Sequence, residues 1–210
     1  SNVTSIDWRG RKRPAVLAFD TGPANMLVDL AARRQGMGKM DRGGRSASRG
    51  TPSEELISEW LRDPFFHKTP PKSTGREYFG EGFYDRVVAG RNLSSHTLLA
   101  TFTEFTARSV ALNYELHLKS SPDEIILTGG GAKNPTMVSR LRKALGKESA
   151  GITIKVSEDV GWPASAIEPA AFAWLAFLRM KKRPGNLPRT TGAKREVLLG
   201  QLIEPARQGR

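Results

Sequence analysis

The chain has 210 residues, of which 38% are hydrophobic and 26% charged, a composition that fits one large globular domain or two small ones. It contains no cysteine, so disulfide frameworks and cysteine metal sites are excluded, and its three histidines lie far apart in sequence. The formal net charge of +12 suggests polyanionic ligands, such as nucleic acid or phosphorylated small molecules.

The basic residues are scattered over loops and both ends of the chain, without interleaved aromatic residues. We therefore interpret them mainly as solvated surface, and a non-catalytic domain that binds polyanions or nucleic acid is the alternative function. No apolar run is long enough to cross a bilayer and no signal peptide is found, so the expected location is cytoplasmic.

The first two apolar segments predict a β-hairpin. Residues 3–6 and 15–19 have strand character and are joined by a polar turn. The second strand leads into Asp20 and a tight turn at Gly22, and a helix is predicted over residues 26–34. A carboxylate at a strand end lies where α/β folds bind ligands, and backbone N–H groups beside a glycine can hold phosphate oxygens. From these residues alone, catalysis and a turn-forming or capping role for Asp20 are equally open.

The next part of the chain alternates between loops and a short helix. Residues 36–52 are rich in Gly, Arg and Ser and predict a mobile loop. A helix is predicted to open at 53–55 and to run through Trp60 and Leu61. The prolines of segment 69–77 exclude regular structure, and its Lys72 and Arg76 either reach an anion or lie in an exposed turn.

A long helix is predicted from Ser94 or Ser95 to about Leu118. Its leucines, phenylalanines and valine form a broad apolar face. We assign this helix to the core rather than to chemistry.

A predicted strand at 124–128 ends in three successive glycines, Gly129, Gly130 and Gly131. Their small size lets a flat ligand lie against the backbone, although a tight turn has the same composition. Asn134 as N-cap and Pro135 at the first helical position predict a helix that stops at Gly146.

The last predicted elements are a strand at 152–156 and a helix from Ile167 to Met180. Ser165 and Glu168 have the spacing of a capping box, but Pro169 would remove a backbone hydrogen bond from that helix. Residues 184–210 form a tail of Pro, Gly and mixed charge around one apolar patch.

Several motifs in this order resemble one family, the anhydro-N-acetylmuramic acid kinases of bacterial cell-wall recycling. They span nearly the whole chain, and their combination is far more specific than any one of them. The matching stretches are Phe19–Pro23 with Asn25–Leu27, Pro70–Glu77, Gly129–Ala132 with Asn134–Pro135, Ala166–Glu168 with Ala171–Ala176, and Asn186–Pro188 with Thr191–Ala193.

The resemblance implies an α/β fold of the sugar kinase, heat-shock ATPase and actin superfamily. In that superfamily two ribonuclease H-like domains, each a mixed sheet flanked by helices, enclose ATP in a cleft. It implies that residues 1–183 form the C-terminal domain, that 184–210 form a tail segment, and that the N-terminal domain is absent. The chain is then expected to be a fragment that is inactive alone and homodimeric at full length.

The implied reaction opens 1,6-anhydro-N-acetylmuramic acid with water and phosphorylates it from ATP, with Mg²⁺, to N-acetylmuramic acid 6-phosphate. The expected partners are therefore the anhydro sugar and ATP, and neither nucleic acid nor a membrane. The resemblance implies these roles: Asp20 as general base; Thr21, Gly22, Gly129, Gly130, Gly131 and Asn134 as ATP-binding residues; and Glu168 as a sugar contact that competes with its capping role.

The sequence departs from the family pattern at three positions. Ala24 stands where the family usually has Gly, Lys133 replaces a usual His, and Pro169 replaces a small helix former. None of these changes removes Asp20.

Overall fold

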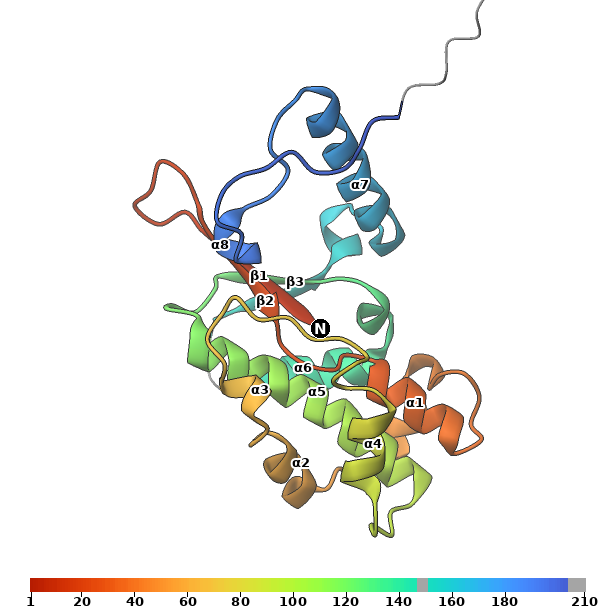
Figure 1. The fold of residues 1–210 in the computed structure, drawn as a ribbon. Helices are drawn as coiled ribbons and strands as arrows, with labels where there is room; N and C mark the ends of the chain where they lie inside the picture. Colours follow the sequence, from red (N-terminus) through yellow and green to blue (C-terminus); the bar gives the residue numbers. More distant parts are fainter. Residues whose placement is uncertain (147–150, 204–210) are drawn as a thin grey trace, which may run out of the picture.

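The computed structural model describes residues 1–146 and 151–203, which form helices and two small β-sheets (Figure 1). The strands are β1 (Asn2–Asp7), β2 (Ala15–Asp20), β3 (Glu124–Leu127) and β4 (Thr153–Val156). The helices are α1 (Met26–Arg34), α2 (Glu54–Trp60), α3 (Pro64–His67), α4 (Glu81–Val88), α5 (Ser95–His117), α6 (Pro135–Gly146), α7 (Ala164–Met180) and α8 (Pro188–Thr191). Short 3₁₀ helices span Arg42–Gly44, Ala47–Arg49, Gly130–Lys133 and Ser157–Val160.

The strands form two separate pairs. β1 and β2 make the predicted antiparallel hairpin, in which Asn2 lies opposite Asp20 and Asp7 opposite Ala15. β3 and β4 pair in parallel, with Glu124 opposite Thr153. The α/β class is confirmed, but within the described residues the expected single mixed sheet is divided between these two pairs. Residues of both β1 and β3 line one cavity, and in the part of the chain that the structure describes no hydrogen-bonded ladder joins the two sheets.

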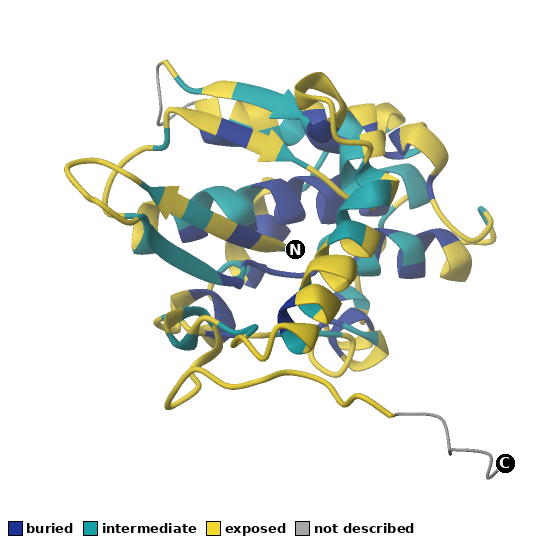
Figure 2. Cartoon of the chain, turned by 90° about the horizontal axis from the view of Figure 1, so that it is seen from above, coloured by how far each residue is buried: buried dark blue, intermediate teal, exposed yellow. Residues whose placement is uncertain are grey.

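The main hydrophobic cluster is built around α5, which runs through the middle of the molecule in Figure 1. The cluster is rich in aromatic residues, and none of its described members lies in a strand; the largest are Trp60, Phe65, Phe66, Phe79, Phe83, Tyr84, Phe102 and Phe105. The assignment of the long helix to the core is therefore confirmed. Figure 2 shows the buried residues concentrated in the helices, while the C-terminal segment is exposed.

Three helix starts follow the predicted capping chemistry. The hydroxyl of Ser94 accepts a hydrogen bond from the Thr97 N–H (3.1 Å), and that of Ser53 accepts one from the Leu56 N–H (3.4 Å). The Asn134 side chain accepts one from the Met137 N–H (3.1 Å), and Pro135 is the first residue of α6. Each cap satisfies one of the N–H groups that a helix end leaves without a partner.

The start of α7 differs from the prediction. The helix begins at Ala164, and its N-cap residue, Pro163, makes no side-chain hydrogen bond to the first turn. The proposed capping box of Ser165 and Glu168 is therefore wrong. The Glu158 carboxylate instead accepts a hydrogen bond from the Ala164 N–H (3.2 Å), and this contact lowers the pKa of Glu158. Pro169 lies inside the helix rather than ending it.

The Gly- and Arg-rich segment 36–52 contains two of the 3₁₀ helices. Asp41 accepts hydrogen bonds from the Ser46 and Ala47 N–H groups, both at 2.9 Å. The Thr136 hydroxyl, on α6, donates to the Gly44 carbonyl at 3.0 Å. These contacts anchor the middle of the segment, an arrangement that composition did not predict, while the mobility of the segment stays a prediction.

The C-terminal segment contacts the N-terminal hairpin. In the C-terminal segment, α8 packs against β2, and the Gly185 N–H donates to the Val197 carbonyl at 3.2 Å. None of the described helices combines the length and the apolar character that crossing a membrane requires.

Candidate functional site

Asp20 is the last residue of β2 and is held by a segment that lies more than fifty residues further along the chain. Its N–H donates to the Lys72 carbonyl (3.0 Å), and its Oδ2 accepts from the Thr74 N–H (2.7 Å). The carboxylate is half-buried, and among the described residues Oδ1 accepts no hydrogen bond. The side chain is thus fixed through one oxygen, which leaves the other able to contact water or a ligand.

The turn after Asp20 packs closely on α5. Thr21 is fully buried; its hydroxyl donates to the Ser1 Oγ (2.8 Å), and its N–H donates to the Ser1 carbonyl (2.8 Å). Gly22 has a φ of +143°, and a Cβ there would lie 2.7 Å from the Ser109 hydroxyl oxygen. The turn therefore needs a glycine to approach the helix, whereas the sequence suggested a glycine needed for approach to a ligand.

Ala24 occupies the left-handed region of backbone space, with a φ of +52°. Its carbonyl accepts a hydrogen bond from the Thr106 hydroxyl (2.9 Å), which ties the turn to α5. A residue with a Cβ in this conformation costs roughly 1–2 kcal/mol, whereas glycine adopts it freely. The position where the family usually has Gly is thus one where this chain carries backbone strain.

We predict that Ala24→Gly raises the free energy of unfolding by about 0.5–1 kcal/mol, because relief of strain exceeds the extra entropy that glycine loses on folding. Urea denaturation measures the change. The matched control is Ala31→Gly, in the buried middle of α1, which should lower stability by about 1 kcal/mol. A loss of stability in both variants would contradict the strain at Ala24.

Lys72 is buried. It therefore has neither of the two roles that the sequence left open, which were contact with an anion and a place in an exposed turn. Its Nζ donates to the Phe65 carbonyl (3.2 Å) and the Phe66 carbonyl (2.8 Å), at the C-terminal end of α3. Burial, with a smaller contribution from Lys68, lowers the pKa of Lys72 to about 8. These hydrogen bonds attach segment 72–74 to α3. The same segment holds Asp20 through the Lys72 carbonyl and the Thr74 N–H.

The triple-glycine loop lies beside the turn that follows β2. Gly129 has a φ of +83°, and Gly130 begins a short 3₁₀ helix that leads to Asn134. A Cβ on Gly130 would lie 3.5 Å from the Asn25 amide nitrogen. The two glycine-containing turns, more than a hundred residues apart in sequence, therefore meet at Asn25, which the sequence analysis did not single out.

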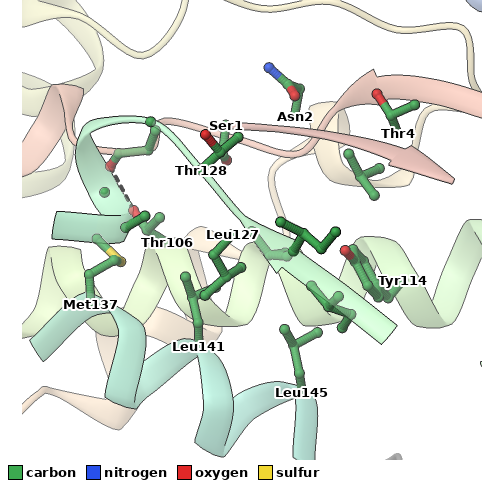
Figure 3. A pocket seen from close by; sticks show the side chains of 18 of the residues that line it. Ser1, Asn2, Thr4, Thr106, Tyr114, Leu127, Thr128, Met137, Leu141 and Leu145 are labelled. Carbon is green, nitrogen blue, oxygen red and sulfur yellow. Dashed lines mark hydrogen bonds between the residues drawn. The ribbon is translucent and has the colours of Figure 1, made fainter. Parts of the chain in front are cut away.

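One cavity of about 1550 Å³ brings several of the predicted residues together. Figure 3 shows another part of its lining, which includes Ser1, Tyr114 and Leu141. Its lining includes the whole triple-glycine loop, Asn25, Arg76 and Glu168, whose side chain is exposed on α7. The residues Asp20, Thr21, Gly22 and Asn134 do not line it. The structure thus groups the triple-glycine loop with Glu168 in one cavity, and the lining of this cavity does not include Asp20.

Sequence reasoning missed two groups that shape this site. The Thr74 N–H, which holds Asp20, carries no sequence signal because backbone groups are the same in every residue other than proline. Asn25 lies within a motif that the sequence analysis quoted, so its place beside the glycines was accessible in principle. No described cluster of three or more His, Asp or Glu side chains offers a metal site.

The architecture is consistent with the class of α/β kinase domains, in which turns after strands carry the ligand contacts. A sequence model of the anhydro-N-acetylmuramic acid kinase family matches residues 2–205. The chain belongs to this family.

Curated relatives carry the same description. The chain is 46% identical over 204 residues to the anhydro-N-acetylmuramic acid kinase of Picosynechococcus sp., an alignment that covers 95% of this chain and 52% of that protein. It is 43% identical over 207 residues to that of Gloeobacter violaceus, covering 98% of this chain and 53% of the relative. The chain spans about half the length of the curated relatives it matches.

Proposed function

We propose that this chain forms part of an ATP-dependent kinase that hydrolytically opens 1,6-anhydro-N-acetylmuramic acid and phosphorylates it to N-acetylmuramic acid 6-phosphate. The observation that supports this most directly is the family match over residues 2–205. Two structural features also support it: the carboxylate of Asp20 is anchored by the Thr74 N–H, and the triple-glycine loop lines a cavity.

In this proposal Asp20 is the general base. Water attacks the anomeric carbon of the sugar, its proton passes to the carboxylate, and the bond from that carbon to the bridging 6-oxygen breaks. The released 6-oxygen attacks the γ-phosphorus of ATP, and ADP leaves. The hydrogen bond from Thr74 fixes one carboxylate oxygen of Asp20, so that the other is oriented toward the water.

The nucleotide contacts are assigned to backbone groups. The glycines of the loop 129–131 allow the nucleoside to approach the main chain. Because the Thr21 N–H and hydroxyl already donate to Ser1, the phosphate contact at this turn is assigned to the Gly22 N–H. Asn134 is engaged as the cap of α6, so its contribution to ATP binding is assigned to holding the end of the loop.

Other groups complete the proposal. Glu168 and Arg76, both at the cavity, are assigned to the sugar and to an anionic group of either substrate. Mg²⁺ commonly binds through phosphate oxygens, water and at most one or two carboxylates, so the lack of a described acidic cluster is compatible with an ion that arrives with ATP. When bound, the ion supplies neutralisation of the phosphate charge.

The finer architecture is also proposed here. Residues 1–183 would form a ribonuclease H-like domain of the actin-like ATPase type and residues 184–210 a tail segment. A further domain would supply the opposing phosphate loop, and the assembled enzyme would be a homodimer. The length of the relatives, about twice that of this chain, supports the further domain of the family-length protein.

The test uses a family-length chimera, in which this chain replaces the matched half of the Picosynechococcus kinase. The chimera is incubated with ATP, Mg²⁺, the anhydro sugar and oxygen-labelled water, and products are identified by mass spectrometry. The labelled oxygen should appear on the anomeric carbon and not in the phosphate. A chimera that folds but forms no sugar phosphate, or that places the label in the phosphate, would refute the proposed reaction.

A further inference from the structure

The ammonium group of Lys72 contacts three separate elements of the fold. Its Nζ donates to the Phe65 and Phe66 carbonyls of α3 and lies 3.3 Å from the Nε2 of His117, the last residue of α5. The same nitrogen lies 5.8 Å from the ring centroid of Phe19, in β2, and 5.0 Å from that of Phe65. Both distances are within the range of a cation–π contact. The ammonium group therefore joins α3, α5 and β2 at one point.

The contact with His117 defines which ring nitrogen carries the proton. An ammonium group has donors only, so the His117 Nε2 must be the acceptor and the proton lies on Nδ1. Burial, with a smaller contribution from the charge of Lys72, lowers the pKa of His117, so the ring is mainly neutral at about pH 7. The ring packs edge-on against Phe19, with the centroids 5.3 Å apart. Lys72 and His117 therefore both contact the side chain that directly precedes Asp20.

The backbone of segment 72–74 holds Asp20 itself. The Lys72 carbonyl accepts a hydrogen bond from the Asp20 N–H (3.0 Å), and the Thr74 N–H donates to the Asp20 Oδ2 (2.7 Å). The segment lies in neither a helix nor a strand, and among the described residues the buried hydroxyl of Thr74 has no hydrogen-bond partner. The ammonium group of Lys72 thus supplies the side-chain hydrogen bonds that the structure shows for this segment.

The stability of the fold gives little reason for a buried lysine at this position. Burial, with a smaller contribution from Lys68, lowers the pKa of Lys72 from 10.5 to about 8, so folding disfavours the charged form. The Phe65 carbonyl also accepts a hydrogen bond from the Lys68 N–H (3.3 Å) and keeps this partner without Lys72. Replacement by methionine would remove the burial cost together with the hydrogen bonds of the ammonium group, and these two effects on stability oppose each other.

We propose that Lys72 is a positioning residue for Asp20, which it holds in the geometry of a general base through Phe19, its own carbonyl and Thr74. The inference rests on the proposed function and adds to it a residue that does not line the cavity. A general base must lie within hydrogen-bond distance of the proton that it takes, and a displacement of about 1 Å can lower the rate about 100-fold. Loss of the ammonium group should therefore lower turnover more than substrate affinity.

The first measurement is amide hydrogen exchange by NMR in the full 210-residue chain, without substrate. In Lys72→Met the amides of Asp20 and Thr74 should exchange at least about tenfold faster than in the parent, because segment 72–74 opens locally. The amide of Phe105, in the buried part of α5, should keep its rate, and urea denaturation checks that the variant is folded. Unchanged exchange at Asp20 and Thr74 would overturn the proposal. A variant that does not fold would also overturn it, since Lys72 would then serve the fold itself.

The second measurement is the turnover of the family-length chimera with the same substitution. In Lys72→Met the turnover number should fall at least about tenfold, while the Michaelis constants for ATP and the anhydro sugar stay within about threefold. Lys72→Arg keeps a positive charge with N–H donors, so it should recover part of the loss in both measurements. An equal loss in Lys72→Arg and Lys72→Met would assign the effect to side-chain shape rather than to the hydrogen bonds, and would contradict the proposal.

The matched control is Lys68→Met, which makes the same chemical change at an exposed lysine four residues earlier. It should leave the exchange at Asp20 and Thr74 and the turnover number within about twofold of the parent. The two measurements separate this inference from the proposed function. A parent chimera that forms no sugar phosphate would refute the proposed function, whereas exchange in the 210-residue chain would still show whether Lys72 holds Asp20. Full turnover of Lys72→Met in an active chimera would refute the positioning role alone.

Discussion

Replacing Glu104 with alanine is expected to lower the free energy of unfolding by about 3 kcal/mol, because it leaves two arginines without their buried partner. Glu104 lies on α5 with 9% of its side chain exposed. It accepts hydrogen bonds from Arg108 and, across the helix interface, from Arg140 of α6, both at 2.9 Å. Urea denaturation at neutral pH measures the loss.

The pH dependence of the stability difference between the native chain and Glu104→Ala shows whether the ionised carboxylate of Glu104 causes it. Burial alone would raise the pKa of Glu104, but the hydrogen bonds from Arg140 and Arg108 outweigh it and hold the pKa below the ordinary value of 4.5. A depressed folded-state pKa contributes stability that is complete above the unfolded-state value and lost as pH falls through the folded-state value. The gap between the native chain and Glu104→Ala should therefore narrow as the pH is lowered below about 4.5.

The control is an exposed ion pair of similar length. Glu59 and Arg91 lie 2.8 Å apart, and their side chains are 48% and 38% exposed. Glu59→Ala should cost less than about 1 kcal/mol, since water screens the pair and already solvates both groups. Equal losses at Glu59 and Glu104 would show that burial does not strengthen the α5–α6 contact.

The sequence predicted those elements whose signals are local. Ser94, Ser53 and the Asn134–Pro135 pair start helices because each supplies a cap or a preset backbone angle within its own turn. The short helices α3, α4 and α8 were missed, since a few residues carry little periodicity and their stability comes from packing. The capping box at Ser165 failed because the helix starts at Ala164, where Glu158 supplies the contact.

The candidate site was less accessible to sequence reasoning. The position of Asp20 at a strand end followed from a local pattern, but its hydrogen bond to Thr74 joins residues 54 positions apart. Lys72 looks like a solvent-exposed charge in sequence, and only the fold brings the Phe65 and Phe66 carbonyls to its ammonium group. Contacts of this kind depend on tertiary structure, which periodicity and capping rules do not encode.

Replacing Asp20 with asparagine should lower the turnover number of the family-length chimera by at least about 100-fold, the contribution of a positioned general base. This expectation rests on the proposed function. An asparagine oxygen can still accept the hydrogen bond from the Thr74 N–H, so the side chain should keep its place while losing the ability to take a proton. The Michaelis constants should change little, because the variant removes a group that acts mainly in the transition state.

The assay follows phosphorylated sugar over time, and urea denaturation confirms that the variant is as stable as its parent. The control is Asp85→Asn, which neutralises an exposed carboxylate on α4 that does not line the cavity and should leave turnover within about twofold. Near-normal turnover in Asp20→Asn would remove Asp20 from the role of base. A rise in the Michaelis constants at unchanged turnover would instead assign Asp20 to substrate binding, because uniform binding affects affinity and leaves the chemical step unaltered.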